Sequence, residues 1–224
     1  MLPTSLIITA AGKGTRFGAI NKLFLDLDNK PLIIHTCESF LGFDFFEETI
    51  ITIALEEKKY LEDLLKEYKL DQFFKVIIGG ATRKESVQLA MQELAPVKRI
   101  FIHDGARPNI SKRLIKALYQ AAQEYLAVIP GIPVVDTIKL ANDQNFVENT
   151  PPRNKLFQIQ TPQVFDYAAL QEIYQKANNS LANSITDEAM LFEFFDIPIK
   201  IIPGERSNLK ITYPEDLLLL KKAD

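Results

Sequence analysis

The chain has 224 residues, of which 47% are apolar and 25% are charged. This balance is that of a soluble globular protein and excludes a disordered, collagen-like or coiled-coil chain. The 26 Lys and Arg against 29 Asp and Glu leave a net charge of −3, which would attract neither nucleic acid nor an anionic membrane. An anionic ligand would therefore need cations gathered locally. We predict one domain over residues 1–224 that carries an insertion.

Two features bear on where the protein works. The longest charge-free stretch, residues 1–12, is shorter than the roughly 18 to 20 residues that cross a bilayer, and no basic segment of a signal peptide precedes it. Cys37 is the single cysteine, so that no intramolecular disulfide can form. We therefore expect a protein of the reducing cytoplasm that binds neither membranes nor nucleic acid.

Short apolar runs alternate with longer segments of helical period in the first part of the chain. The strand-like runs are 5–10, 49–54, 74–78, 99–103 and 126–129. Because they are short and too apolar for half-exposed strands, they predict buried strands of a parallel sheet. The helical segments between them are 31–41, 57–68, 84–94 and 111–125. This alternation predicts an α/β fold, a Rossmann-like, doubly wound and mostly parallel sheet.

The pattern changes after Pro130. Residues 133–160 hold strand-like pieces, 134–140 and 156–160, around turn-prone segments, and no helix fits this span. We interpret the span as an inserted β-arm, too small to bury a core of its own and therefore packed on the main body or on another subunit. The α/β pattern then returns with helices at 166–177 and 187–195, a strand at 197–202, and a final helix that opens with the capping-box pattern of residues 212–215.

The strongest local signal follows the first predicted strand, in the sequence A-A-G-K-G-T-R-F-G at residues 10–18. Its glycines let backbone N–H groups approach an anion, at the place where nucleotides bind in open α/β folds. The spacing matches neither the dinucleotide motif nor the P-loop. Lys13, Arg16 and Lys22 nevertheless favour phosphate-transfer chemistry, which needs cations where negative charge develops. The alternative is a tight structural turn with solvated basic residues.

Asp104 ends the strand predicted at 99–103. A carboxylate at the carboxyl end of a central strand points into the ligand crevice, and its oxygens suit the Mg²⁺ that accompanies a nucleoside triphosphate. The alternative is an Asp that caps the next turn, with Arg107 as its partner. We expect the neighbouring His103 to be a packed strand residue and not a catalyst.

The turn at residues 79–86 follows another predicted strand and leads into a helix. Its free N–H groups and the Ser86 hydroxyl could read the edge of a base, although an ordinary helix N-terminus is the simpler interpretation. Farther along the chain, Thr137, Arg153 and Lys210 supply hydroxyls and cations from distant segments. Together they suit a second phosphate-bearing substrate, whereas each alone is typical of a solvated surface.

Taken together, these motifs resemble one family, the 2-C-methyl-D-erythritol 4-phosphate cytidylyltransferases of the non-mevalonate isoprenoid pathway. The resemblance covers residues 7–217, and the motifs occur in the order A-A-G-K-G-T-R-F-G, G-G-x-x-R-x-x-S-V, H-D-G-A-R-P, P-V-x-D-T-I-K, Q-T-P-Q-x-F, T-D-E-A and N-L-K-I-T-x-P-E-D-L. It implies an enzyme that couples CTP to methylerythritol phosphate with release of pyrophosphate. It also implies a Mg²⁺ cofactor and a homodimer whose β-arms cross into the partner subunit.

The resemblance also implies a role for each matching residue. Arg16 and Lys22 would be catalytic and stabilise the transition state at the α-phosphate. Nucleotide-binding residues would be Ala11, Gly12, Lys13 and Gly14 around the triphosphate, Gly80, Ala81 and Ser86 around the cytosine, and Asp104 and Gly105 at the ribose and the metal. Residues that bind the acceptor would be Thr137, Arg153, Thr161 and Lys210, with Arg153 supplied by the partner's arm.

Two alternatives to this function remain. The ribitol 5-phosphate cytidylyltransferases share most of the motifs, so the acceptor is less firmly indicated than CTP. A nucleotide sensor on the same fold would be expected to lack Arg16 or Lys22, and both are present. The chain also departs from the family at Asn21, where the family often has proline. This change concerns the conformation of the loop before Lys22 and removes no charged residue.

Overall fold

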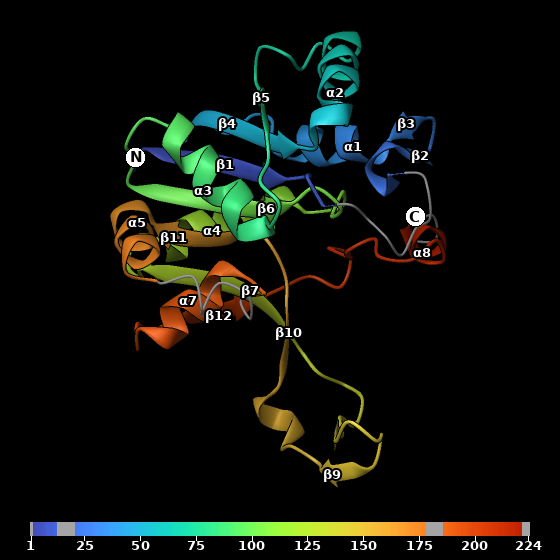
Figure 1. Ribbon diagram of the computed structural model, residues 1–224, viewed down its shortest axis with the longest axis vertical. Coiled ribbons are helices and arrows are strands. Elements are labelled where there is room, and N and C mark those ends of the chain that lie inside the picture. Colours follow the sequence, from blue (N-terminus) through green and yellow to red (C-terminus); the bar gives the residue numbers. More distant parts are fainter. Residues whose placement is uncertain (1, 13–20, 178–185, 221–224) are drawn as a thin grey trace.

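A mixed sheet forms the centre of the computed structural model, which describes residues 2–12, 21–177 and 186–220 (Figure 1). The strands run in the order β10-β7-β11-β6-β1-β4-β5, and β12 also pairs with β7. They are β1 (Thr4–Thr9), β4 (Phe46–Ile53), β5 (Lys75–Ile78), β6 (Arg99–Asp104), β7 (Ala127–Pro133), β10 (Phe157–Ile159), β11 (Gln163–Asp166) and β12 (Lys200–Pro203). The pairs β1–β4, β1–β6, β4–β5 and β7–β12 are parallel. The predicted doubly wound, mostly parallel α/β sheet is therefore confirmed.

Alternate residues of the central strands build two separate cores, one on each face of the sheet. Leu6 and Ile8 of β1 belong to one core and Ile7 to the other, as the twofold period of a strand requires. The first core is covered by α1 (Leu32–Ser39), α2 (Leu55–Glu67) and α4 (Lys112–Ala121), and the second by α3 (Arg83–Glu93), α5 (Tyr167–Lys176) and α7 (Glu188–Phe194). None of the described helices is long and apolar enough to cross a membrane.

Two strands of the sheet differ from the sequence expectations. The prediction that residues 74–78 form a buried strand is wrong in its burial, because β5 lies at the edge of the sheet and Ile78 is 44% exposed. The sequence analysis also missed β11, which is fully buried and antiparallel to both β6 and β7. The strand is hard to predict because it begins and ends with polar residues, Gln163 and Asp166. These residues can be buried because each has a polar partner inside the protein.

Further short elements lie beside the sheet, at the right of Figure 1. They are η2 (Lys22–Phe24), the hairpin of β2 (Asp26–Leu27) and β3 (Lys30–Pro31), and the final helix α8 (Asp216–Leu220). The predicted capping box at residues 212–215 is wrong. The helix begins later, and the Asp216 carboxylate accepts the backbone N–H groups of Thr212 at 2.7 Å and Tyr213 at 2.8 Å. Residues 214 and 215 form a turn instead.

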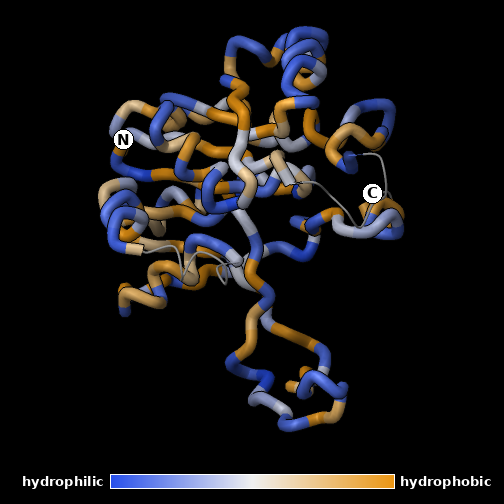
Figure 2. The backbone as a smooth tube through the Cα atoms, viewed as in Figure 1, coloured by the Kyte–Doolittle hydropathy of each residue, from blue (hydrophilic) through white to orange (hydrophobic). Residues whose placement is uncertain are grey.

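Residues 134–156 extend away from the sheet as an arm (Figure 1). The arm contains β8 (Leu140–Ala141), β9 (Val147–Asn149) and the single turn η3 (Arg153–Lys155). All residues from 135 to 150 are exposed, and hydrophobic and hydrophilic segments alternate along them (Figure 2). The predicted strand at 134–140 is wrong over most of its length, because residues 134–139 pair with no described strand. The strand predicted at 156–160 is confirmed as β10.

Candidate functional site

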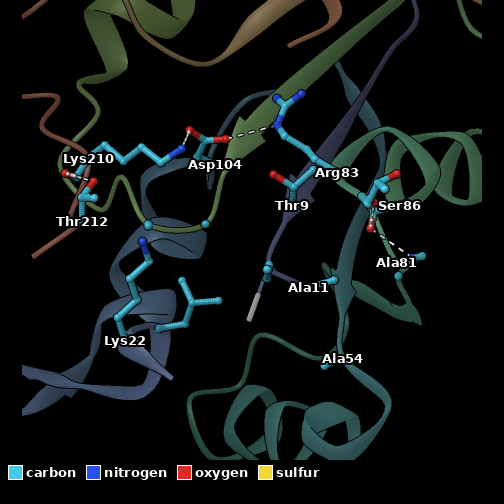
Figure 3. Close-up of a pocket in the computed structure, with 18 residues that line it drawn as sticks. Thr9, Ala11, Lys22, Ala54, Ala81, Arg83, Ser86, Asp104, Lys210 and Thr212 are labelled. Carbon is cyan, nitrogen blue, oxygen red and sulfur yellow. Dashed lines mark hydrogen bonds and ion pairs between the residues drawn. The ribbon is translucent and has the colours of Figure 1, made fainter. Parts of the chain in front are cut away.

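A cleft of about 360 Å³ opens at the carboxyl ends of the parallel strands (Figure 3), the edge at which ligands bind in open α/β folds. Its walls are the ends of β1, β4 and β6, the turn after β5, the start of η2 and the segment before α8. The predicted site residues that it brings together are Ala11, Gly12, Lys22, Gly80, Ala81, Ser86, Asp104, Gly105 and Lys210. Residues that are up to 199 positions apart in the sequence thus share one cleft.

The turn between β5 and α3 is held together by its own side chains. The Thr82 hydroxyl accepts the N–H of Glu85 at 3.1 Å, and the Glu85 carboxylate accepts the N–H of Ala81 at 2.8 Å. The Ser86 hydroxyl accepts the N–H of Gly80 at 3.0 Å and donates to the carbonyl of Thr82 at 2.9 Å. The expectation of free N–H groups is therefore wrong for Gly80 and Ala81. What this turn offers a ligand is a rigid backbone surface.

The two glycines of this turn leave no room for a side chain. A Cβ atom on Gly79 would lie 2.5 Å from the Cβ of Ala11, and one on Gly80 would lie 2.3 Å from the Cβ of Glu85. Real Cβ atoms do not approach carbon atoms so closely. The turn after β5 therefore packs directly on the turn after β1, and backbone atoms form this wall of the cleft.

Asp104 is the one acid among the described residues that line the cleft. Its carboxylate lies 2.9 Å from Lys210 Nζ and 3.5 Å from Arg83 Nε (Figure 3). It also lies 3.6 Å from Arg107 Nε. Burial alone would raise the pKa of Asp104, but these cations, Arg83 most strongly, lower it to below its ordinary range. The carboxylate is therefore ionised at neutral pH, and the cations around it leave the site positively charged.

A chain of hydrogen bonds behind Asp104 fixes the end of β6. The backbone N–H of Asp104 donates to Thr161 Oγ1 at 3.0 Å, and Thr161 Oγ1 lies 3.1 Å from His103 Nδ1. His103 Nε2 lies 3.1 Å from the carbonyl of Arg107. A carbonyl can only accept, so we assign the proton to Nε2, and Nδ1 accepts from the Thr161 hydroxyl. The prediction that His103 is a packed residue is confirmed, since it is fully buried.

Lys22 is positioned by a hydrogen bond of its own side chain and by the hydrogen bonds of the preceding residue, Asn21. Lys22 Nζ donates to the carbonyl of Ile211 at 2.7 Å. The preceding Asn21 caps η2 by accepting the N–H of Leu23 at 3.0 Å, and its amide donates to both carboxylate oxygens of Glu57 at 2.8 Å. Asn21, which departs from the family pattern, therefore contributes its own anchor for the segment that carries Lys22.

Six predicted residues are not among the described residues that line the cleft. Lys13, Gly14 and Arg16 lie outside the described residues. Thr137 and Arg153 are exposed on the arm, where Arg153 Nη1 donates to the carbonyl of Val135 at 2.7 Å. The roles predicted for these five residues remain predictions. The same is true of acceptor binding by Thr161, which is 5% exposed, does not line the described cleft and supports the backbone of Asp104.

Arg83 is a charged residue of the cleft that the sequence analysis left without a role. It is the first residue of α3 and contacts Asp104. One signal could have found it. Cations at the first turn of a helix are disfavoured by the helix dipole, so an arginine there followed by Lys84 suggests that some other interaction retains it.

Burial lowers the pKa of His103 to about 4, against about 6.5 in an unfolded chain. As the pH falls from 6.5 to 4, His103 becomes protonated in the unfolded chain but stays largely neutral in the native protein. We therefore expect stability to be lost on acidification, with a contribution from His103 of about 3 kcal/mol at pH 4. Urea unfolding across this range should show a smaller loss in His103→Gln than in a matched His35→Gln control. Equal losses in both variants would contradict this assignment.

Comparisons with known proteins agree with the sequence motifs. The family model described as 2-C-methyl-D-erythritol 4-phosphate cytidylyltransferase matches residues 4–222. Proteins of that name from Alkaliphilus metalliredigens and Bacillus cereus strain ATCC 14579 are 38% and 39% identical to this chain. Each alignment covers 96% of the chain, and 90% and 95% of the respective relative.

Solved structures give the same result. The 4-diphosphocytidyl-2C-methyl-D-erythritol synthase of Anaerococcus prevotii is 32% identical with a TM-score of 0.83, over 97% of this chain and 93% of that one. The 2-C-methyl-D-erythritol 4-phosphate cytidylyltransferase of Francisella tularensis also has a TM-score of 0.83, at 28% identity over 97% and 98% of the two chains. With its motifs, fold and cleft, this chain therefore belongs to the 2-C-methyl-D-erythritol 4-phosphate cytidylyltransferase family.

Proposed function

We propose that the protein is a cytidylyltransferase that joins CTP to 2-C-methyl-D-erythritol 4-phosphate, releasing pyrophosphate, in the synthesis of isoprenoid precursors in the cytoplasm. The observation that carries the proposal is the set of cations in the cleft of a chain from this family. Lys22, Arg83 and Lys210 line the cleft, and Arg107 contacts its Asp104. Two substrates that both carry phosphate need this charge.

The nucleotide would occupy the part of the cleft between the turns after β1, β5 and β6. Its triphosphate would lie on the turn of Ala11, Gly12, Lys13 and Gly14, its cytosine on Gly80, Ala81 and Ser86, and its ribose near Asp104 and Gly105. The close packing of Gly79 on Ala11 supports this arrangement, because it gives the base and the triphosphate one continuous backbone surface. Backbone N–H groups beyond the end of a first parallel strand suit phosphate.

The reaction is an in-line displacement at the α-phosphorus. An ionised phosphate oxygen of the acceptor attacks, the bond to the bridging oxygen of pyrophosphate breaks, and the electron pair leaves with pyrophosphate. The nucleophile is already charged at neutral pH, so the enzyme must supply position and positive charge and needs no general base. Arg16 and Lys22 would stabilise the charge at the α-phosphate. The burial of His103, which keeps it out of the cleft, is consistent with a reaction of this kind.

The residues present fit a Mg²⁺ ion that is held mainly by substrate. Asp104 is ionised and lines the cleft, and no cluster of three acidic, His or Cys side chains occurs in the described part of the chain. Mg²⁺ is typically bound by one or two carboxylates together with substrate phosphates. We propose that Asp104 holds the ion with the triphosphate. When bound, the ion neutralises phosphate charge.

The acceptor site would be shared between two subunits of a homodimer. Thr161 and Lys210 would contribute from one chain, and Thr137 and Arg153 from the partner's arm. The exposure of apolar side chains along the arm supports this proposal, since Phe146 is 67% exposed, and such residues favour burial against another surface.

We expect the purified protein, with Mg²⁺ and CTP, to release pyrophosphate only when methylerythritol phosphate is added. Pyrophosphate release can be followed by a coupled assay, with ribitol 5-phosphate tested in parallel. Faster turnover of ribitol 5-phosphate would replace the proposed acceptor. If no pyrophosphate is released with either acceptor, the result would contradict the proposed function itself.

Lys22→Ala should lower kcat by about 10²- to 10³-fold, the usual loss when one group that stabilises transition-state charge is removed. Steady-state kinetics measure the effect, and thermal denaturation should show little change in folding. Lys59→Ala is the matched control, because that lysine is exposed on α2 and pairs only locally with Asp63. A parallel loss of stability and activity in Lys22→Ala would instead favour a structural role for Lys22.

A site built from two chains can be tested by mixing subunits. Arg153→Ala should leave CTP binding intact and weaken use of the acceptor. When it is mixed with Lys22→Ala, about half of the dimers should be heterodimers with one intact site each, which restores activity to roughly a quarter of wild type. Absence of recovery, with subunit exchange verified by mass spectrometry, would show that Arg153 acts within its own chain.

A further inference from the structure

Glu188 is a buried acid that lies next to the cleft without lining it. It is the first residue of α7, and its side chain is 2% exposed. One carboxylate oxygen pairs with Arg83 Nη1, and the other accepts the hydroxyl of Tyr174 at 3.2 Å. α7 is itself anchored to the sheet, because the carboxylate of Asp187, which caps this helix, accepts the amide of Gln163 of β11 at 2.7 Å.

Arg83 therefore lies between two carboxylates, and its contacts with them differ. Its Nη1 is hydrogen-bonded to Glu188. Its Nε is 3.5 Å from Asp104 Oδ1, close enough for charge attraction but too far for a good hydrogen bond. Its Nη2 is buried with no hydrogen-bond partner among the described residues. Among the described residues, Glu188 is the hydrogen-bond partner of the guanidinium, and this bond opposes its rotation into a direct two-point bond with Asp104, the geometry that Arg and carboxylate groups favour.

Arg107 is also hydrogen-bonded to a group other than Asp104, here a backbone carbonyl. Its Nη1 donates to the carbonyl of Asn208 at 2.8 Å, and its Nε, which is 3.6 Å from Asp104, has no hydrogen-bond partner in the described structure. Of the three cations, only Lys210 contacts the carboxylate closely. Asp104 is thus surrounded by positive charge while most of its lone pairs stay open for a ligand.

We propose that Glu188 is a positioning residue, which holds Arg83 away from Asp104 so that the Asp104 carboxylate stays available to the nucleotide. Glu188 acts through Arg83 and touches no substrate. The inference rests on the proposed function, because it concerns the same cleft. It adds that the Asp104 carboxylate is kept available by Glu188, an acid on α7, although the cation that Glu188 holds belongs to α3.

The first test is structural and needs no substrate. In Glu188→Gln, the amide cannot retain Arg83 by charge, so we expect a crystal structure to show Arg83 turned to within hydrogen-bond distance of Asp104. An unchanged position of Arg83 in that structure would overturn the proposal. This outcome does not depend on which reaction the enzyme catalyses.

The second test is a double-mutant cycle on kcat/KM for CTP. We expect Glu188→Gln to lower it about 10- to 100-fold, the usual effect of residues that orient a binding group. In an Arg83→Gln background the same change should cost less than about twofold, because its target is gone. Glu172→Gln, an exposed acid on α5, is the matched control and should change nothing. Equal losses in both backgrounds, or no loss at all, would overturn the proposal.

The proposal remains testable if the Glu188 variant is unstable or if the proposed reaction does not occur. If Glu188→Gln is too unstable to assay, Arg83→Lys tests the same contact. A single ammonium group cannot contact both carboxylates as the planar guanidinium does. This variant should lose activity while it keeps its charge, and full activity would contradict the proposal. If the wild-type protein fails to turn over CTP with methylerythritol phosphate, the proposed function fails, and the crystallographic test of Glu188 still stands.

Discussion

The attraction of three cations to one carboxylate, Asp104, is the interaction on which the cleft depends. Lys210 comes from the segment before α8, Arg83 from the start of α3, and Arg107 from the loop after β6. These segments are joined to the sheet in different places, so the carboxylate is their common point. Without its charge, cations in a largely buried site would repel one another, and removal of one partner from such a cluster is costly.

Local sequence patterns were sufficient to predict the framework of this site. The central strands β1, β4 and β6 are covered on both faces, so each carries consecutive apolar residues, such as Leu6–Ile8 in β1 and Ile100–Ile102 in β6, and the strands stand out from the helices. Parallel strands bring their carboxyl ends to one edge. The residues at or just beyond the ends of β1, β5 and β6, Gly12, Gly80 and Asp104, could therefore be assigned to one cleft before any contact was known.

The contacts that tune the site could not be predicted in this way. Arg83 and Glu188 are 105 positions apart, and Lys22 and Ile211 are 189 apart. The local sequence at Arg83 indicates that another group retains this cation, but it does not identify a partner so far away in the chain. The strand β11 was not predicted for a related reason, because the polar residues at its ends form hydrogen bonds with groups from other elements. The arm was predicted, but the strand expected at 134–140 was wrong over most of its length, because residues 134–139 have the composition of a strand but no described partner strand.

The packing of Gly79 on Ala11 has a consequence for how this cleft can evolve. The two turns touch so closely that an added methyl group on Gly79 would overlap the one on Ala11. A side chain at position 79 can be accommodated only if Ala11 is replaced by glycine or the two turns separate, and separation would split the surface on which base and phosphates are proposed to lie. Substitutions at positions 11 and 79 should therefore be correlated among related sequences, so that the two turns change as one unit.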